Sequence, residues 1–224
     1  MRICALIPAF NEAGYVGSVV EGALRHVEEA LVIDDGSTDG TAAVARAVGA
    51  TCLGWPRNRG KAMALRAGIE SAAVRGFSHV VTLDADGQHR PDDIPSLVRT
   101  ARETGADLVI GMRPFDPALM PRSRYFSNTI GSRIASTLVG RDIRDSQCGF
   151  RLYRLDKLRR LRLRSRSYEF EMEVLIKMAR AGWVIAHAPV AMVYDNGRAR
   201  SKMRPVRDTV RICLWSLAFR FLRA

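Results

Sequence analysis

The chain has 224 residues, which is enough for one α/β domain with a substantial core, and its hydrophobic content of 47% is ordinary for a globular protein. Its formal net charge is +12, and the two halves differ: residues 1–112 hold 11 Lys and Arg against 14 Asp and Glu, whereas residues 113–224 hold 24 against 9. The first half therefore suits a metal ion, and the second suits an anionic partner such as phosphate, nucleic acid or an acidic membrane surface.

Neither export nor a membrane span is indicated by the sequence. The four cysteines, Cys4, Cys52, Cys148 and Cys213, lie far apart, so they predict neither a zinc site nor a disulfide framework. The apolar run before Pro8 is too short for a signal peptide. The longest charge-free run, 181–194, is shorter than the roughly 20 residues that a transmembrane helix needs. We therefore expect a reducing compartment and no transmembrane helix.

Strands and helices alternate along the first half. Apolar runs predict strands over 3–7, 31–33, 51–53, 80–83 and 107–110. Helical spacing and capping residues predict helices over 16–27, 41–48, 59–75 and 92–103. Because the connections are short, this order predicts right-handed βαβ units and an α/β fold with a mostly parallel sheet.

Polar side chains follow three of these strands. The clusters are Asn11/Glu12, Asp34/Asp35 and Asp84/Asp86/Gln88. Ligands of parallel sheets bind outside the carboxyl ends of the strands, so we expect the three clusters to converge there. Carboxylate and amide oxygens suit Mg²⁺ or Mn²⁺, which bind together with the phosphates of a substrate. The alternative for Asp-x-Asp is an acidic turn that caps the next helix.

The second half has a different pattern. Apolar residues recur every fourth position from Phe126 to Leu138, with Arg122, Arg124 and Arg133 among them, which predicts a basic amphipathic helix. Residues 145–151 are predicted as a loop, 152–163 as an Arg-rich segment, 170–180 as a helix and 184–193 as extended chain.

A second amphipathic helix is predicted over 204–223. Its apolar face is flanked by five arginines, a composition typical of a helix that lies in a membrane interface. Each Arg near an anionic leaflet contributes about 1 kcal/mol. The alternative is a terminal helix docked on its own domain or on a second subunit.

Several motifs occur in an order that resembles the family 2 glycosyltransferases, and more narrowly the dolichyl-phosphate mannose and glucose synthases with their bacterial polyprenyl-phosphate relatives. The motifs are Ile7-Pro8-Ala9-Phe10-Asn11-Glu12, Val32-Ile33-Asp34-Asp35-Gly36-Ser37-Thr38-Asp39, Asn58-Arg59-Gly60-Lys61, Leu83-Asp84-Ala85-Asp86-Gly87-Gln88-His89, Asp145-Ser146-Gln147-Cys148-Gly149-Phe150-Arg151, Tyr168-Glu169-Phe170-Glu171-Met172-Glu173 and Ser201-Lys202-Met203. They span nearly the whole chain.

The resemblance implies a glycosyltransferase-A (Rossmann-like) fold and inverting transfer of mannose or glucose from a GDP- or UDP-sugar to a polyprenyl phosphate. It implies a catalytic domain over 1–203, in which 1–112 form the nucleotide-sugar and metal half and 113–203 the acceptor half. Residues 204–224 would form the membrane-surface helix, which implies a peripheral protein on the cytoplasmic face of the membrane.

The resemblance also implies roles for individual residues. The nucleotide site would comprise Pro8, Ala9, Phe10, Asn11, Glu12, Asp35, Lys61, Asp84, Ala85, Asp86 and Lys202. Mg²⁺ or Mn²⁺ would be bound by Asp84, Asp86 and Gln88, and the acceptor phosphate by Arg122, Arg124, Arg133 and Thr137. The catalytic residues would be Asp86, Arg122, Arg133 and Glu173, with Glu173 in a supporting role that orients Arg151 or a backbone amide.

Two alternatives remain open at this point. A soluble family 2 glycosyltransferase with a glycan, protein or small-molecule acceptor would need a general base, for which Glu171 or Glu173 is the candidate. A basic nucleic-acid-binding protein would use the charge of the second half but leaves the acidic strand-end clusters unexplained. We therefore expect no nucleic-acid partner, and the sequence does not predict an oligomeric state.

Overall fold

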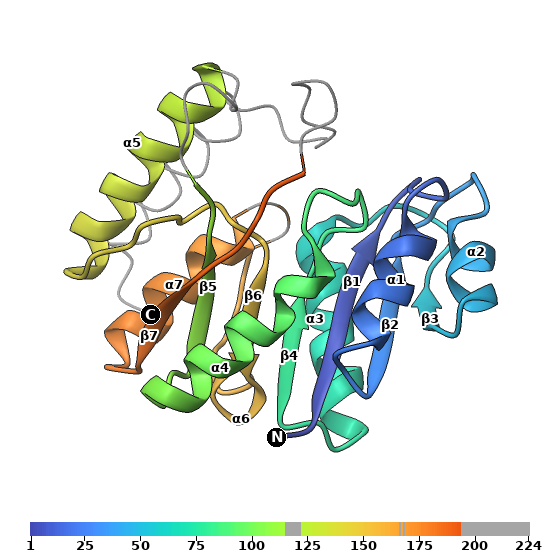
Figure 1. The fold of residues 1–224 in the computed structure, drawn as a ribbon, viewed down its shortest axis with the longest axis horizontal. Helices are drawn as coiled ribbons and strands as arrows, with labels where there is room; N and C mark the ends of the chain where they lie inside the picture. The colour runs from blue at the N-terminus through green and yellow to red at the C-terminus, as the bar shows by residue number, and fades with distance from the viewer. Residues whose placement is uncertain (115–121, 166, 168, 194–224) are drawn as a thin grey trace.

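The computed structural model describes residues 1–114, 122–165, 167 and 169–193. Its centre is one seven-stranded sheet with the strand order β3-β2-β1-β4-β6-β5-β7 (Figure 1). The strands are β1 (Ile3–Ala9), β2 (Glu29–Asp34), β3 (Thr51–Gly54), β4 (His79–Thr82), β5 (Leu108–Met112), β6 (Arg151–Arg154) and β7 (Ile185–Pro189). The helices are α1 (Val16–Leu24), α2 (Thr41–Ala47), α3 (Lys61–Val74), the 3₁₀ turn η1 (Pro91–Asp93), α4 (Ile94–Thr104), α5 (Arg122–Val139), α6 (Leu155–Leu158) and α7 (Phe170–Arg180).

Helices cover both faces of the sheet. In Figure 1, α1 and α4 lie in front of the sheet, with α2 beside α1, and α3 and α7 lie behind it. Helix α5 stands outside these two layers and packs against α7. None of the helices in the described ranges is long and apolar enough to cross a bilayer.

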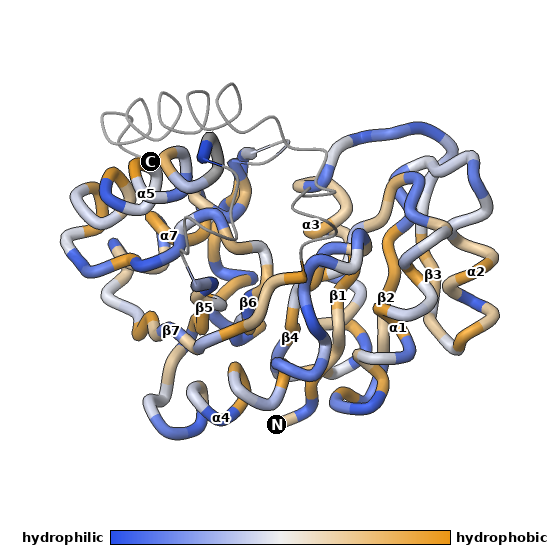
Figure 2. The backbone as a smooth tube through the Cα atoms, turned by 45° about the horizontal axis from the view of Figure 1, so that its top comes forward, coloured by the Kyte–Doolittle hydropathy of each residue, from blue (hydrophilic) through white to orange (hydrophobic). Residues whose placement is uncertain are grey.

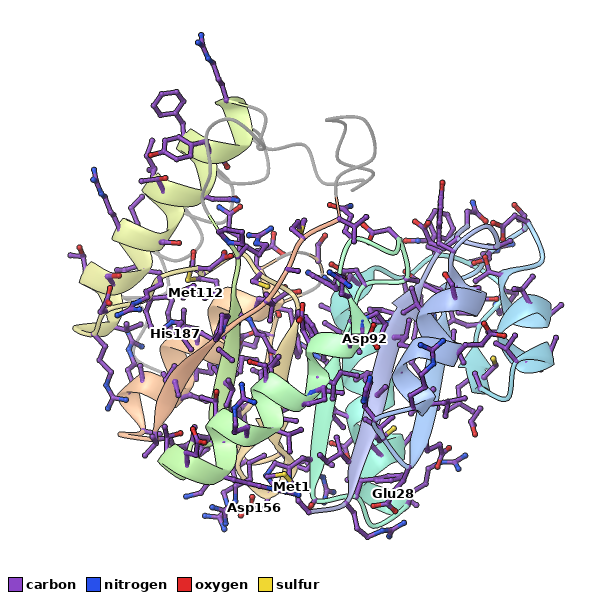
Figure 3. All side chains as sticks on the ribbon, viewed as in Figure 1. Met1, Glu28, Asp92, Met112, Asp156 and His187 are labelled. Atoms are coloured by element: carbon purple, nitrogen blue, oxygen red, sulfur yellow. The ribbon has the colours of Figure 1, made fainter. Side chains whose placement is uncertain are left out.

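The core lies along the central strands. β1 and β2 are apolar over almost their whole length and are buried on both faces, as expected for parallel strands that are covered by helices (Figure 2). Met1, Glu28 and Asp156 mark the amino edge of the sheet, at the bottom of Figure 3. The strand-end clusters that the sequence singles out lie at the opposite edge.

The parallel architecture predicted from the sequence is confirmed, with one correction. The segment 151–154 was expected to belong to a loop and an Arg-rich segment, but it forms β6, which lies antiparallel between β4 and β5. A strand of four residues that begins and ends with arginine gives too weak a pattern to be identified from sequence. Arg151 is fully buried, and its hydrogen bonds go to the carbonyls of Ser146 and Cys148 in the preceding loop and of Glu171 on α7.

The helix predicted around Phe126–Leu138 is confirmed as α5, and two large apolar residues are exposed on it. Phe126 and Ile130 are 60% and 51% exposed. The buried side carries small and polar residues instead: Ser127, Asn128, Gly131, Ser132 and Ala135. The exposed side of α5 therefore combines large apolar side chains with the exposed Arg122 and Arg133.

The predicted interface helix over 204–224 and the Ser201-Lys202-Met203 motif lie outside the described residues. The chain leaves the described part at Val193, whose backbone N–H donates to the Gln88 carbonyl at 2.9 Å. In Figure 1 the segment after β7 runs up to the loop that joins β4 to α4.

Candidate active site

A cavity of about 320 Å³ lies at the carboxyl ends of β1, β2 and β4. This is the edge at which parallel α/β sheets bind their ligands. The lining comes from all three strand-end clusters, from the start of α3 and from the segment before α7: Pro8, Ala9, Phe10, Glu12, Asp35, Asn58, Gly60, Lys61, Ala64, Asp84, Ala85, Asp86 and Ser167.

Asp35 ties the end of β2 to the loop that leads into α3. Its Oδ1 accepts hydrogen bonds from Trp55 Nε1 at 2.6 Å and from the Arg59 backbone N–H at 2.7 Å, and its Oδ2 accepts one from the Gly60 N–H at 2.9 Å. Asp35 is nearly buried, so these donors compensate for the loss of water around its charge. The loop before Lys61 is thereby fixed against the sheet.

The loop after β2 is also attached to the loop after β1. Asn11 has a positive φ of 52°, and its side-chain oxygen accepts from the Thr38 N–H at 2.8 Å. Gly36 has a φ of 82°, and a Cβ there would lie 2.6 Å from the Arg57 carbonyl carbon. Asn11 thus supports the wall of the cavity but does not line it, which refines its predicted role in nucleotide binding.

Lys61, at the first position of α3, joins two carboxylates. Its Nζ lies 2.7 Å from Asp84 Oδ1 and 2.9 Å from Glu171 Oε1. Burial favours the neutral amine, but the two carboxylates outweigh burial and raise the pKa of Lys61 above its usual value. Burial likewise opposes ionisation of Asp84, but the Lys61 charge outweighs it and lowers the pKa of Asp84. Lys61 is therefore a fixed positive charge in the cavity wall.

Asp86 is in a different environment from Asp84. Burial, together with the nearby Asp84 charge, raises the pKa of Asp86 to about 6. Gln88 orients the carboxylate: its backbone N–H donates to Oδ1 at 3.0 Å and its side-chain Nε2 donates to Oδ2 at 2.6 Å. A buried carboxylate that resists ionisation is suited to receive additional positive charge.

The fit of a divalent cation can be judged from these donors. Asp84 and Asp86 are hard oxygen donors on one loop and both line the cavity. Gln88 is buried behind Asp86, and its amide nitrogen faces that carboxylate. Within the described ranges no three His, Cys, Asp or Glu side chains converge on a common point. Mg²⁺ often takes one or two carboxylates together with substrate phosphates, and the two aspartates fit that pattern.

The loop 145–150 lies against Asp84 and Lys61 but does not line the cavity. The Gly149 carbonyl accepts from Thr82 Oγ1 at 2.6 Å, and a Cβ on Gly149 would lie 3.2 Å from both Asp84 Oδ2 and Lys61 Nζ. Glycine at 149 thus lets the loop approach the two charged side chains closely, because a larger residue would have to displace them.

Two buried arginines hold this loop. Arg113, at the end of β5, binds Asp145 through Nε–Oδ2 and Nη2–Oδ1 contacts of 2.6 and 2.8 Å. Arg151 donates to the carbonyls of Ser146, Cys148 and Glu171 at 2.6 to 2.7 Å. The two parallel contacts of Arg113 with Asp145 are typical of an arginine–carboxylate pair. Together, Arg113 and Arg151 fix the loop, and neither side chain lines the cavity.

His89 and Cys148 lie behind the Asp84 loop. Burial lowers the pKa of His89 to about 4 and raises the pKa of Cys148 to about 12. The His89 ring lies 5.3 Å from that of Phe150. Both groups are neutral at physiological pH and contribute packing at this position.

Glu173 lies away from the cavity lining. Its carboxylate accepts from the backbone N–H groups of Arg164 and Ser165 at 2.8 to 2.9 Å, and it pairs with Lys177 at 2.9 Å. The structure thus places it where it orients backbone amides, one of the two supporting roles expected from the sequence. Whether it influences catalysis stays a prediction.

The predicted acceptor residues lie on α5. Arg122, Arg133 and Thr137 are exposed, and the Thr137 hydroxyl donates back to the Arg133 carbonyl at 3.0 Å. The side chain of Arg124 falls outside what the structure describes, as does Lys202. Helix α5 contacts the loop behind Asp84, because Ser132 Oγ accepts from the Ser146 N–H at 3.0 Å and Gln147 Nε2 donates to the Ser127 carbonyl at 3.3 Å.

Away from the cavity, His187 on β7 and Met112 on β5 lie near α5 (Figure 3). His187 Nε2 accepts from the Arg144 N–H at 3.3 Å, and burial lowers the pKa of His187. His187 therefore has a structural role, as an acceptor for a backbone amide.

Four residues that line the cavity were not predicted from the sequence: Asn58, Gly60, Ala64 and Ser167. The ion pair between Glu171 and Lys61 was not predicted either. Asn58 and Gly60 belong to a recognised motif, and that signal could have identified them. Glu171 could not be distinguished by sequence from its neighbour Glu173, because both lie in the first turn of α7. Only the packing of α7 against the sheet decides which of them reaches Lys61.

Comparisons with known proteins assign the family. Residues 4–162 match the model of glycosyl transferase family 2. An undecaprenyl-phosphate mannosyltransferase of Micrococcus luteus is 32% identical over 99% of this chain and 96% of its own length. A polyprenol monophosphomannose synthase of Mycolicibacterium smegmatis is 28% identical over 100% of this chain and 90% of its own length.

A solved structure gives the same fold. It is the structure of glucosyl-3-phosphoglycerate synthase from Mycobacterium tuberculosis in complex with Mn²⁺, uridine diphosphate and glucosyl-3-phosphoglycerate. The two structures superpose with a TM-score of 0.74 at 23% sequence identity, over 98% of this chain and 79% of that one. The sheet described above is thus of the glycosyltransferase-A type. With most of its length matched by the family model and its strand-end carboxylates gathered in one cavity, the chain belongs to glycosyl transferase family 2 and is a glycosyltransferase.

Proposed function

We propose that this enzyme transfers a hexose from a nucleoside-diphosphate sugar to a polyprenyl phosphate at the cytoplasmic surface of a membrane. The observation that carries the acceptor part of this proposal is the exposed side of α5, where large apolar residues and arginines lie together. Phe126 and Ile130 point outward beside the exposed Arg122 and Arg133. A surface that offers apolar side chains and guanidinium groups together matches the two parts of a lipid phosphate, its chain and its charged head.

On the donor side, the cavity has room for a nucleotide and the charges to hold a diphosphate. Lys61 supplies a fixed positive charge, and Asp84 and Asp86 would hold Mg²⁺ or Mn²⁺. When bound, the divalent cation neutralises the negative charge that the departing diphosphate gains. Asp35 and the loop it anchors would form the wall against the nucleoside.

On the acceptor side, a general base is not needed. A phosphate monoester is ionised at neutral pH, so its oxygen needs charge neutralisation and correct placement rather than deprotonation. Arg122 and Arg133 are suited to that task, because a guanidinium group binds phosphate through two parallel hydrogen bonds. The Glu171 carboxylate is bound to Lys61, and Glu173 binds backbone amides, so neither is placed as a ready base.

Helix α5 and the donor cavity are linked through a short loop. Ser146 and Gln147 contact α5, and Gly149, two to three residues further on, adjoins Asp84 and Lys61. This proximity supports a single reaction site in which a phosphate guided along α5 meets the sugar. Residues 204–224, which lie outside the described part, would add a second membrane contact.

The relatives support the acceptor class. The names of the Micrococcus and Mycolicibacterium proteins specify a mannosyl group and a polyprenyl phosphate, and a dodecaprenyl-phosphate galacturonate synthase of Rhizobium johnstonii is 31% identical over 76% of this chain. We therefore propose a polyprenyl phosphate as the acceptor and mannose as the first sugar to test.

The test is a transfer assay that combines GDP-mannose or UDP-glucose with a short polyprenyl phosphate in liposomes, with and without EDTA. We expect a lipid-linked hexose with one of the donors, and its loss when EDTA removes the metal. The same assay with 3-phosphoglycerate as a water-soluble acceptor is the control. Transfer to the soluble acceptor without transfer to the lipid would refute the proposal.

A further inference from the structure

The Lys61 ammonium group is shared by two carboxylates from distant parts of the chain. It lies 2.7 Å from Asp84 Oδ1 and 2.9 Å from Glu171 Oε1. Asp84 is on the loop after β4 and lines the cavity, whereas Glu171 is on α7 and is not among the lining residues. Glu171 therefore contacts the donor site through Lys61.

Glu171 is held in place independently of its carboxylate. Its backbone carbonyl accepts from Arg151 Nη1 at 2.7 Å, and Arg151 is fully buried with two further carbonyl partners on the loop behind Asp84. The side chain of Glu171 is itself only 11% exposed. Because its main chain is fixed, Glu171 offers Lys61 a stationary second partner in addition to Asp84.

The charges of the cluster match those of its proposed ligand. The carboxylates of Asp84, Asp86 and Glu171 carry three negative charges when ionised, and Lys61 carries one positive charge. The balance of two negative charges equals the charge of one divalent cation. Without Glu171, Lys61 would neutralise Asp84 alone and would compete with the cation for it.

We propose that Glu171 is a positioning residue of the donor site. By holding Lys61 between itself and Asp84, it leaves Asp84 able to bind a divalent cation while it keeps the ammonium group beside the place of the diphosphate. This inference rests on the proposed function, because it presumes that the cavity binds a cation and a nucleoside diphosphate.

The test measures metal and nucleotide binding separately, without turnover. Mn²⁺ binding to nucleotide-free protein is followed by electron paramagnetic resonance, and binding of GDP and UDP in EDTA by calorimetry. For Glu171→Gln we expect Mn²⁺ to bind about tenfold more weakly, as is typical when one member of a coupled charge cluster is removed. Binding of metal-free nucleotide should stay within about twofold or tighten, because Lys61 is released toward the phosphates.

The partner variant Lys61→Met should have the opposite effects. Asp84 loses its competing cation, so Mn²⁺ binding is expected to stay equal or tighten, while metal-free nucleotide binds more weakly. Glu70→Gln is the charge-matched control: Glu70 lies on α3 like Lys61, is exposed, and pairs with Arg159 at 3.3 Å. It changes the net charge equally and should leave Mn²⁺ affinity within about twofold.

Three results would overturn the inference. The first is an unchanged Mn²⁺ affinity in Glu171→Gln. The second is a parallel loss of Mn²⁺ binding and of metal-free nucleotide binding in that variant, which would indicate a merely structural role. The third is weaker Mn²⁺ binding in Lys61→Met. If Glu171→Gln does not fold, the sign of the Lys61→Met effect decides. Failure of the wild-type protein to bind Mn²⁺ and both nucleotides would instead refute the donor site of the proposed function, and this inference with it.

Discussion

Residues 1–112 and residues 122–193 contribute to the site in opposite ways. In the first region the functional side chains follow directly after parallel strands, so neighbouring strands bring their polar ends together at one edge. In the second region the charged residues divide between buried clamps and an exposed helix. Arg151 is fully buried, whereas Arg133 is exposed.

The comparison shows that a charged side chain can serve ligand binding or the stability of the fold. Which of the two it serves depends on whether it lines a cavity, lies on the surface or is buried among fixed partners. Asp84 and Asp86 of the first region line the cavity, because they follow a strand that ends at the sheet edge. Arg151 of the second region, and Arg113 just before that region, are bound to fixed partners and hold the loop that lies against Asp84. The predictions below separate these two uses of charge, from the largest expected effect to the smallest.

The largest effect is expected for Asp86→Asn, which removes a carboxylate from the cavity while keeping nearly the same shape. Hexose transfer should fall by at least about 10³-fold, because one of the two carboxylates that would hold the divalent cation at the departing diphosphate is lost. Initial rates at saturating Mg²⁺ or Mn²⁺ measure this loss. Retention of more than about a tenth of wild-type turnover would exclude Asp86 from the reaction.

Next in size is the loss of stability in Arg151→Met. Three buried carbonyl groups would lose their donor, so the free energy of unfolding should fall by about 3 to 5 kcal/mol. The control is Arg154→Met in the same strand, where the side chain is 45% exposed and its ion pairs are worth about 1 kcal/mol or less. Urea unfolding of both variants measures the difference, and equal losses would show that burial does not distinguish the two arginines.

A smaller effect is expected on the stability of the metal-free protein. The pKa of Asp86 is raised to about 6 in the folded state, so the folded protein binds more protons than the unfolded chain between about pH 4 and 6. Its contribution to stability is therefore present at low pH and is lost as the pH rises through about 6. In EDTA at pH 7, Asp86→Asn should be more stable than wild type by up to about 3 kcal/mol.

The difference should shrink near pH 4, because the folded carboxyl is then almost fully protonated and no longer bears the cost of a buried charge. Urea unfolding at the two pH values measures it. A variant that is less stable than wild type at pH 7 would show that the Asp86 carboxylate is not strained by its burial.

The smallest effect concerns the exposed arginines of α5. Arg133→Ala should raise KM for the polyprenyl phosphate by about tenfold, the size of one charge-assisted hydrogen bond to phosphate, with KM for the donor unchanged. Arg159→Ala is the matched control, since Arg159 is exposed and pairs with Glu70 on α3. Equal effects of the two variants would indicate that only net charge matters, and would remove α5 from the acceptor site.

Much of this arrangement could be predicted from the sequence. The strand-helix alternation of residues 3–110 predicted the parallel sheet, because apolar periodicity is a local property of the chain. The clusters after β1, β2 and β4 predicted the cavity, because parallel strands align their carboxyl ends. Most of the expected nucleotide residues, from Pro8 to Asp86, do line it.

The tertiary structure alone decided what depends on contacts between distant segments. It placed the short strand β6 antiparallel inside the sheet, left Phe126 and Ile130 of α5 exposed, and chose Glu171 rather than Glu173 as the partner of Lys61. No local pattern encodes these choices, because each depends on which segment packs against which, and the burial of a charge is favourable only where the fold supplies its partners.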